Sequence, residues 1–296
     1  FELQINGTPI DQADGLRWDI TLNMSKNISK VVSLYKDDFQ DVQNLVLKTS
    51  VMDWAIIEAR VGGTFGEIYG IDYARDEKGN KLIDDSGYPI KGDYKKLGDI
   101  NPDFIGGLSN KLSYKNFNLS FLIDFQLGGE YYSHSSLYRD LMGTGTTSLK
   151  GREEWDSTHQ GFGYFLPIPG VFPDGYIEDG IVASTGLPNE KPVQPIFRQV
   201  ETLVNRSIVT DYIMDASNVR FRELVFGYTL PSKWLDKTFI ARANISLVGR
   251  NLFFLYLATK NIDPEAGFDA GNFGTAFELN TMPGTRSYGF NLNLSF

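Results

Sequence analysis

Polar and apolar residues alternate along several stretches of about ten residues each, a length typical of β-strands. The last stretch, 287–296, alternates without interruption, and Leu16–Ser25 and Phe117–Leu127 follow the same pattern with few exceptions. The stretch 241–247 repeats it with smaller side chains. Such alternation predicts strands with one apolar and one polar face. Because helical periodicity is hard to find, the sequence predicts an all-β fold.

One strand changes phase part-way along its length. Its apolar residues occupy odd positions up to Phe221 and even positions from Leu224 onward. A slip of one residue moves side chains to the opposite face, so the pattern predicts a β-bulge near Glu223. Weaker strand patterns cover about 43–50 and 55–73.

Short and long connections alternate between the predicted strands. An outer-membrane barrel explains this rhythm, because its periplasmic turns are short and its extracellular loops are long. Its strands also alternate between a lipid-facing apolar side and a polar side that faces the lumen. The short links are 6–15, 115–116 and 230–239, and the long ones are 27–42 and about 74–104, 128–216 and 254–285.

The predicted architecture is a transmembrane antiparallel β-barrel of which the chain, 1–296, supplies the C-terminal part. About nine strands fit the pattern, and nine do not close an even-numbered barrel. An open edge in lipid leaves backbone groups unpaired, so we expect a larger barrel whose earlier strands lie outside these residues. A complete small outer-membrane barrel, acting as adhesin or pore, and a soluble all-β binding module remain as alternatives.

Composition and charge narrow the function classes. The net charge of -9 argues against nucleic-acid binding, which needs an excess of Lys and Arg. No Cys and only two His exclude disulfides, thiol nucleophiles and the common zinc sites. No nucleophile, metal or phosphate-binding motif appears, so we expect no enzyme, no cofactor and no metal site. The acidic stretch 76–85 departs from the EF-hand spacing and favours hairpin turns.

Several blocks resemble the C-terminal barrel region of SusC/RagA-like TonB-dependent transporters of Bacteroidota outer membranes. The blocks follow the order of that family and cover most of the chain from about residue 60 onward. They are GEIYG at 66–70, RDEKGNKLIDDSGYPI at 75–90, LGDINPDFIGGLSNKLSYKNFNLSFLIDFQLGG at 97–129, DASNVRFRELVFGYTLP at 215–231, ISLVGRNLFFL at 245–255, NIDPEAG at 261–267 and the terminal RSYGFNLNLSF.

The resemblance implies a barrel of about 22 strands filled by an N-terminal plug. It implies nutrient import driven through a TonB complex, with a SusD-like surface lipoprotein as a lid over the barrel. The ligands it implies are oligosaccharides or oligopeptides. We expect the plug and the TonB-contacting segment to be absent from this chain, since no block matches them.

The longest loop carries the candidate contacts to ligand or lid. Aromatic faces with polar rims suit both sugars and peptide side chains, and they equally suit packing of the loop on itself. The candidates are Tyr131, Tyr132, His134, Trp155, Tyr164, Phe172 and Tyr176.

Three arginines near strands are expected to face the lumen. An arginine in the lipid band costs about 2–4 kcal/mol, whereas the hydrated interior accepts it and offers carboxylates of the plug as partners. These residues are Arg220, Arg222 and Arg242.

The terminal strand has two expected roles. Its apolar side faces the lipid bilayer, and its aromatic end looks like the signal read by the barrel assembly machinery. The residues involved are Tyr288, Phe290, Leu292, Leu294 and Phe296, with Phe296 at the periplasmic rim.

Overall fold

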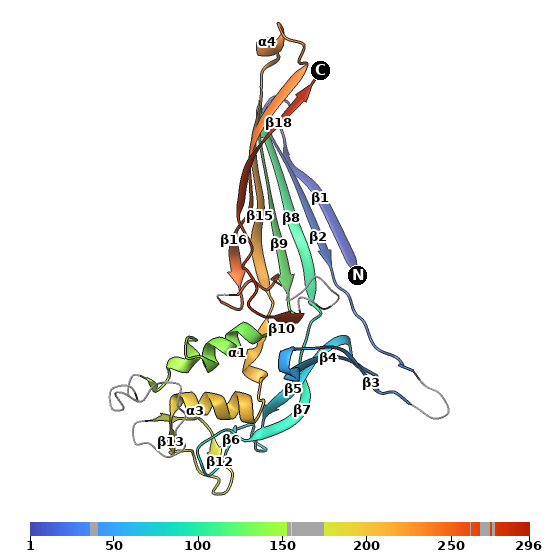
Figure 1. Cartoon of the computed structure of the whole chain (residues 1–296). Coiled ribbons are helices and arrows are strands. Elements are labelled where there is room, and N and C mark those ends of the chain that lie inside the picture. Colours follow the sequence, from blue (N-terminus) through green and yellow to red (C-terminus); the bar gives the residue numbers. More distant parts are fainter. Residues whose placement is uncertain (36–40, 153–154, 156–174, 261, 267–272, 274–275) are drawn as a thin grey trace.

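A computed structural model describes residues 1–35, 41–152, 155, 175–260, 262–266, 273 and 276–296. A tall curved sheet, here called the wall, rises from a second folded part, here called the loop domain (Figure 1). Strands dominate both parts, as the sequence predicts. Among the described residues, no helix has the length and apolarity needed to cross a membrane.

The wall is a seven-stranded antiparallel sheet in which every strand pairs with its neighbours in chain order. Its two outer strands, β1 and β18, each have one pairing edge without a partner among the described residues. The strands are β1 (Glu2–Asp11), β2 (Leu16–Ser25), β8 (Phe104–Tyr114), β9 (Phe117–Leu127), β15 (Asn218–Thr229), β16 (Arg242–Leu257) and β18 (Ser287–Ser295).

The two faces of the wall differ as the alternation predicts. On one face aromatic rings stack across strands, with Phe221 lying 5.7 Å from Phe121 and 5.3 Å from Phe253 between ring centroids. This apolar face stays open, since 64% of Leu247 and 78% of Phe290 are exposed. A soluble sandwich buries such a face against a second sheet. The described residues supply no such cover, which fits a membrane barrel.

The predicted bulge is confirmed. The register of β15 shifts between Phe221 and Glu223 against both β9 and β16, and against β9 Arg222 is the extra residue. A bulge re-aims the side chains beside it. Here it lets the side chain of Arg222 donate to Asp124 on the polar face. Asp124 is the residue of β9 that lies directly opposite Arg220 of β15.

The alternation of short and long connections is also confirmed, and the two kinds lie at opposite ends of the wall (Figure 1). The short links are 12–15, 115–116 and 230–241, the last of which holds α4 (Ser232–Leu235). The long connections are 26–103, 128–217 and 258–286, and together they build the loop domain.

The number of wall strands needs correction. About nine were expected from the barrel pattern, but the stretches 43–50 and 55–73 belong to a separate four-stranded antiparallel sheet in the loop domain. Its strands are β3 (Asn44–Thr49), β4 (Ala55–Arg60), β5 (Phe65–Tyr73) and β7 (Lys91–Asp99). The physical reason is burial: Ile57 and Ile68 are fully buried and pack a core instead of facing lipid.

Short elements from all three long connections complete the loop domain. β10 (Glu130–Ser133) pairs with β14 (Ile213–Asp215) and, in parallel, with β17 (Phe277–Glu278). Ser133 caps α1 (His134–Leu141) by accepting from Ser136 N. The remaining elements are η1 (Val51–Asp53), β6 (Leu82–Ile83), η2 (Thr147–Leu149), β11 (Tyr176–Ile177), β12 (Ile181–Val182), β13 (Pro192–Val193), α3 (Pro195–Gln199), η3 (Val200–Asn205) and η4 (Thr210–Tyr212).

One apolar core joins these pieces. It contains Ile57 and Ile68 of the four-stranded sheet together with Tyr132, Leu137 and Phe277 from the other two connections. Glu278 ties the same connections by accepting from Ser133 Oγ at 2.8 Å and Ser135 Oγ at 2.7 Å. The three long connections therefore fold as one unit over one end of the wall.

The acidic stretch 76–85 forms the hairpin turns that were predicted. Asp76 Oδ1 accepts from the backbone N–H of Lys78 and Asn80, and Asp84 Oδ1 accepts from that of Ser86. Each turn places a glycine in the left-handed region, with φ of 86° at Gly79 and 91° at Gly87. The carboxylates thus hold the turns in shape.

Candidate functional site

The loop domain encloses a cavity of about 660 Å³, here called the α1–α3 cavity. Its wall comes from α1, the loop that follows it, the β11 region, α3 and η4, with Thr259 and Lys260 from the third long connection. The lining is rich in charged and hydroxyl side chains. Because these segments are far apart in sequence, only the folded loop domain assembles the cavity.

A buried ion triad forms one side of the α1–α3 cavity. Glu178 is 2% exposed, and its two oxygens lie 2.6 Å from Lys81 Nζ and 2.6 Å from Arg198 Nε. Burial by itself raises the pKa of the Glu178 carboxyl, but the hydrogen bond and charge of Arg198, with the charge of Lys81, hold that pKa below its usual range. Glu178 is therefore a fixed anion with its charge already compensated.

A second acid, Asp140 on α1, is held by hydroxyl groups. Thr147 Oγ1 and Tyr212 Oη donate to Asp140, the latter at 3.1 Å. Burial and the neighbouring Asp140 raise the pKa of the Tyr212 phenol, so the hydroxyl keeps its proton and acts as a donor. A Cβ at Gly145 would lie 1.8 Å from Asp140 Oδ1, so only glycine fits there.

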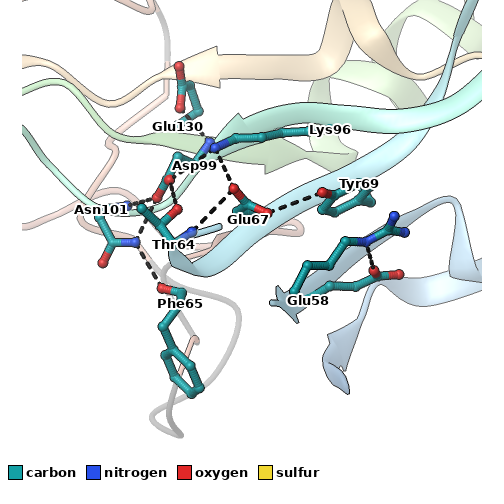
Figure 2. A network of polar contacts seen from close by, with 10 residues as sticks. Glu58, Thr64, Phe65, Glu67, Tyr69, Lys96, Asp99, Asn101 and Glu130 are labelled. Atoms are coloured by element: carbon teal, nitrogen blue, oxygen red, sulfur yellow. Dashed lines mark hydrogen bonds and ion pairs between the residues drawn. The ribbon is translucent and has the colours of Figure 1, made fainter. Parts of the chain in front are cut away.

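A network of polar contacts joins the four-stranded sheet to β10 (Figure 2). Lys96 Nζ lies 2.8 Å from Glu67 and 3.3 Å from Asp99, and Figure 2 shows it between the two carboxylates. Asp99 N donates to Glu130 Oε2 at 2.7 Å. Glu130 follows Gly128 and Gly129, which have φ of 74° and 80° and turn the chain out of β9. The network thus fixes the joint between wall and loop domain.

Glu130 is the member of this network whose ionised form is disfavoured. Its burial first, and then the charges of Asp99 and Asp215, raise the pKa of its carboxyl, although the Asp99 N–H donor opposes the rise. In contrast, the pKa of Glu67 stays below its usual range: burial works against ionisation, but Lys96 outweighs it. The charge of Lys96 opposes the rise at Glu130 as well, but the joint still carries one carboxylate whose pKa is raised.

Replacing Glu130 by Gln tests this electrostatic cost. A raised folded pKa means that Glu130 contributes stability at low pH and loses it as pH rises through that pKa. We expect E130Q to unfold at a higher temperature than the unchanged protein near neutral pH, with the difference shrinking toward about pH 4. Thermal unfolding of the full-length protein across pH measures this, and a difference that stays constant with pH contradicts it.

The polar face of the wall carries a second charge network. Arg220, 4% exposed, lies 2.6 Å from Asp263 and 3.1 Å from Glu265, while Arg222 contacts Asp124 and Glu265. The sequence interpretation gave these arginines partners on a plug. The structure instead gives them carboxylates of this chain, from β9 and from the third long connection.

Arg242 lies on the same face, and no carboxylate among the described residues pairs with it. It is exposed beside Asn244, Asn293 and Ser295 near the short-link end of the wall. All three arginines thus occupy the polar face, and that this face borders the lumen stays a prediction.

Most of the described aromatic candidates of the longest loop are buried. Tyr131, Tyr132, His134 and Trp155 are between 0% and 4% exposed and belong to the packed interior. His134, for example, packs its ring 4.5 Å from that of Tyr138, and burial lowers the pKa of its imidazole. Of the described candidates only Tyr176 lines the α1–α3 cavity. Tyr164 and Phe172 lie outside the described residues.

Sequence reasoning did not single out the charged lining of that cavity. Arg139, Asp140, Glu178 and Arg198 are isolated charges in a long loop, and no spacing connects them. The one feature of the sequence that could have pointed to this lining is the number of charged residues in a region without strand alternation. Their convergence depends on tertiary contacts that the sequence pattern does not encode.

The terminal strand is an outer strand of the wall and carries apolar side chains on one face. Tyr288, Phe290, Leu292 and Leu294 are all exposed on the apolar face. The ring of Phe296 stacks 5.5 Å from that of Phe239, which lies in the short link 230–241. The C-terminus therefore sits at the short-link end (Figure 1).

Two curated proteins of Formosa agariphila match the chain over its whole length. TonB-dependent receptor P3 is 24% identical over 328 residues, and TonB-dependent receptor P26 is 24% identical over 318 residues. The match falls on the C-terminal part of these receptors. The chain is therefore similar to the C-terminal part of two TonB-dependent receptors. It spans only 28% and 29% of the lengths of these two proteins.

Solved structures agree on the fold of this receptor relative. The RagAB peptide importer in its 'open-open' state matches the whole chain with a TM-score of 0.60 at 16% identity, and a structure of the RagAB peptide transporter does so with 0.60 at 18%. The chain covers 28% of each matched chain. These matches confirm the predicted all-β barrel fold and the SusC/RagA-like resemblance. No protein-family model matches the chain.

Proposed function

We propose that this chain forms the C-terminal barrel wall and the surface loops of an outer-membrane, TonB-dependent importer of oligosaccharides or oligopeptides. The observation that carries the proposal is the uncovered apolar face of the wall combined with its relation to TonB-dependent receptors. A face of this kind is stable against lipid and unstable in water.

The orientation follows from the two ends of the wall. Long connections face the outside in outer-membrane barrels, so the loop domain lies on the cell surface and Phe296 on the periplasmic side. The polar face with Arg220 and Arg222 then lines the lumen. The loop domain thereby becomes the first part of the chain that an incoming ligand meets.

The remaining steps of import require partners. We propose a SusD-like surface lipoprotein over the loop domain, a plug within the lumen and a TonB complex that acts on the plug. The RagAB structures that match the chain are described as a peptide importer and a peptide transporter, which supports import as the function. No step makes or breaks a covalent bond of the ligand, and no residue of the chain is proposed to do so.

The two alternative interpretations predict different behaviour. A soluble binding module buries its apolar strand face, which is exposed here at Phe290 and Leu247. A complete small barrel closes on itself, whereas β1 and β18 are the two outer strands of the described sheet and do not pair with each other. Both observations favour a segment of a larger barrel.

Uptake by cells tests the proposal. Cells that carry the full-length transporter should take up labelled short peptides or oligosaccharides, and should stop doing so when TonB is deleted. The matched control replaces the wild-type transporter by one lacking residues 1–296. Uptake that persists without TonB, or that is unchanged without these residues, contradicts the proposed function.

A further inference from the structure

The α1–α3 cavity contains charges that the fold does not use. Glu178 is already paired with Lys81 and Arg198, and Asp140 is held by hydroxyl donors. In the part of the chain that the structure describes, Arg139, Lys150 and Lys260 form no ion pair, and neither does Asp179. The cavity therefore presents both positive and negative groups that remain open to a ligand.

Arg139 is the most constrained of these groups. It lies on α1, and the only described hydrogen bond of its side chain runs from Nη2 to Ser136 Oγ at 2.9 Å. Its Nε is buried without a hydrogen-bond partner among the described residues. A buried N–H donor without an acceptor is unfavourable, and a carboxylate is the partner whose geometry matches a guanidinium.

The acids of the cavity come from other elements than these cations. Asp179 follows β11 and is exposed, and Asp211 lies in η4, where it accepts from Tyr73 Oη at 2.5 Å. Arg139 and Lys260 come from α1 and from the third long connection. A ligand that spans the cavity thus meets cations and acids on different segments.

The aromatic lining is too limited for stacking on sugars. Tyr212 is 5% exposed and its hydroxyl is committed to Asp140. Tyr176 is half-buried, with the guanidinium of Arg198 5.8 Å from its ring. Sugar binding relies on open aromatic faces, and the described lining offers charges and hydroxyls instead.

We propose that the α1–α3 cavity binds a zwitterionic short peptide, with its terminal carboxylate at Arg139 and Lys260 and its ammonium group at Asp179 and Asp211. The proposal rests on the proposed import function and selects the peptide among the ligands that function allows. A neutral glycan leaves Arg139 without an anion, and an anionic glycan sets its charges against Asp179 and Asp211. A zwitterion compensates both signs.

Binding of matched peptides to the purified full-length transporter tests this site. The probes are one tetrapeptide with free termini, its C-terminal amide and its N-acetyl form, with a uronic acid tetramer as the glycan arm. We expect amidation to weaken binding about tenfold, because it removes the anion that a charge-assisted hydrogen bond needs. The uronate should bind more weakly than the free peptide.

Two variants locate the effect in the cavity. R139Q keeps a donor for Ser136 and should bind free and amidated peptides equally well. K260Q changes an exposed side chain without a described contact, so it leaves the fold intact and should reduce the preference for the free carboxylate. The matched control is K237Q, in the short link at the far end of the wall, which should retain the full preference.

The outcomes separate the two proposals. A wild-type transporter that binds and imports peptides without any preference for the free carboxylate overturns the cavity assignment and leaves the import function standing. Preference retained in both R139Q and K260Q overturns it as well, as does tighter binding of the uronate. A transporter that neither binds nor imports any of the probes overturns both.

Discussion

Replacing Arg220 by Met should release the third long connection from the wall. The side chain of Arg220 is 5% exposed, and its Nη2 lies 2.6 Å from the carboxylate of Asp263, a side chain that is 9% exposed. Removing one member of a buried ion pair leaves the other charged and unpaired, at a cost of about 3–5 kcal/mol. We therefore expect the backbone amides of 262–266 to exchange with solvent about 100-fold faster. Hydrogen exchange measured by mass spectrometry on the full-length protein shows this directly.

R250M is the matched control for this prediction. Arg250 also forms an ion pair in the wall, with Glu223 at 2.8 Å, but the two side chains are 64% and 34% exposed. An exposed pair contributes about 0–1 kcal/mol, so its loss should leave exchange at 262–266 nearly unchanged. Equal effects of R220M and R250M would show that the buried pair is not what holds this connection.

The ion pair between Arg220 and Asp263 also connects the wall to the third long connection, which is part of the loop domain. The same connection carries β17, which pairs with β10 beside the buried Glu278. The third long connection therefore contributes both the buried ion pair with Arg220 and a strand of the loop domain. In the proposed importer this places a charged lumen contact and the surface domain within one connected unit.

The strands of the wall could be predicted from the sequence because their two faces lie in different surroundings. An apolar face against lipid and a polar face against water impose strict alternation, and the phase slip at Glu223 marks the bulge in the same way. The four-stranded sheet obeys another rule. Its apolar side chains, such as Ile57 and Ile68, face the core of the loop domain instead of lipid. Both surroundings favour apolar residues, so the sequence pattern does not separate these strands from those of the wall.

The helices and the cavity were not predictable for related reasons. α1 spans only eight residues, too few to be stable alone, so its helical form depends on packing against the core. In the sequence, Tyr132 and His134 look the same whether their rings pack in a core or contact a ligand. Only their burial in the folded structure shows that they pack in the interior. Arg220 and Asp263 pair across 43 residues, a separation that no local pattern encodes.

A positive charge on the apolar face of the terminal strand should block assembly, whereas the same charge on its polar face should not. Leu292 points to the apolar face and Asn291, its neighbour in sequence, to the polar face. If the apolar face meets lipid, L292R places a cation in the bilayer at a cost of about 2–4 kcal/mol, whereas N291R places it in the lumen at little cost. We expect L292R to reduce the amount of folded protein in the outer membrane severely and N291R to leave it close to normal. Heat-modifiable mobility on gels of membrane fractions measures the folded amount.

Deleting Phe296 separates the lipid face from the proposed assembly signal. Phe296 lies beyond β18 and touches Phe239 at the short-link end, so its loss removes no pairing of β18 with β16. If the assembly machinery reads the terminal aromatic residue, the deletion should lower the folded amount in cells while leaving refolding into detergent micelles unchanged. F239A removes the same ring contact but keeps the terminus, and it should assemble normally. Loss of assembly in F239A as well would assign the effect to the Phe239–Phe296 contact, because packing at this rim would then matter more than recognition of the chain end.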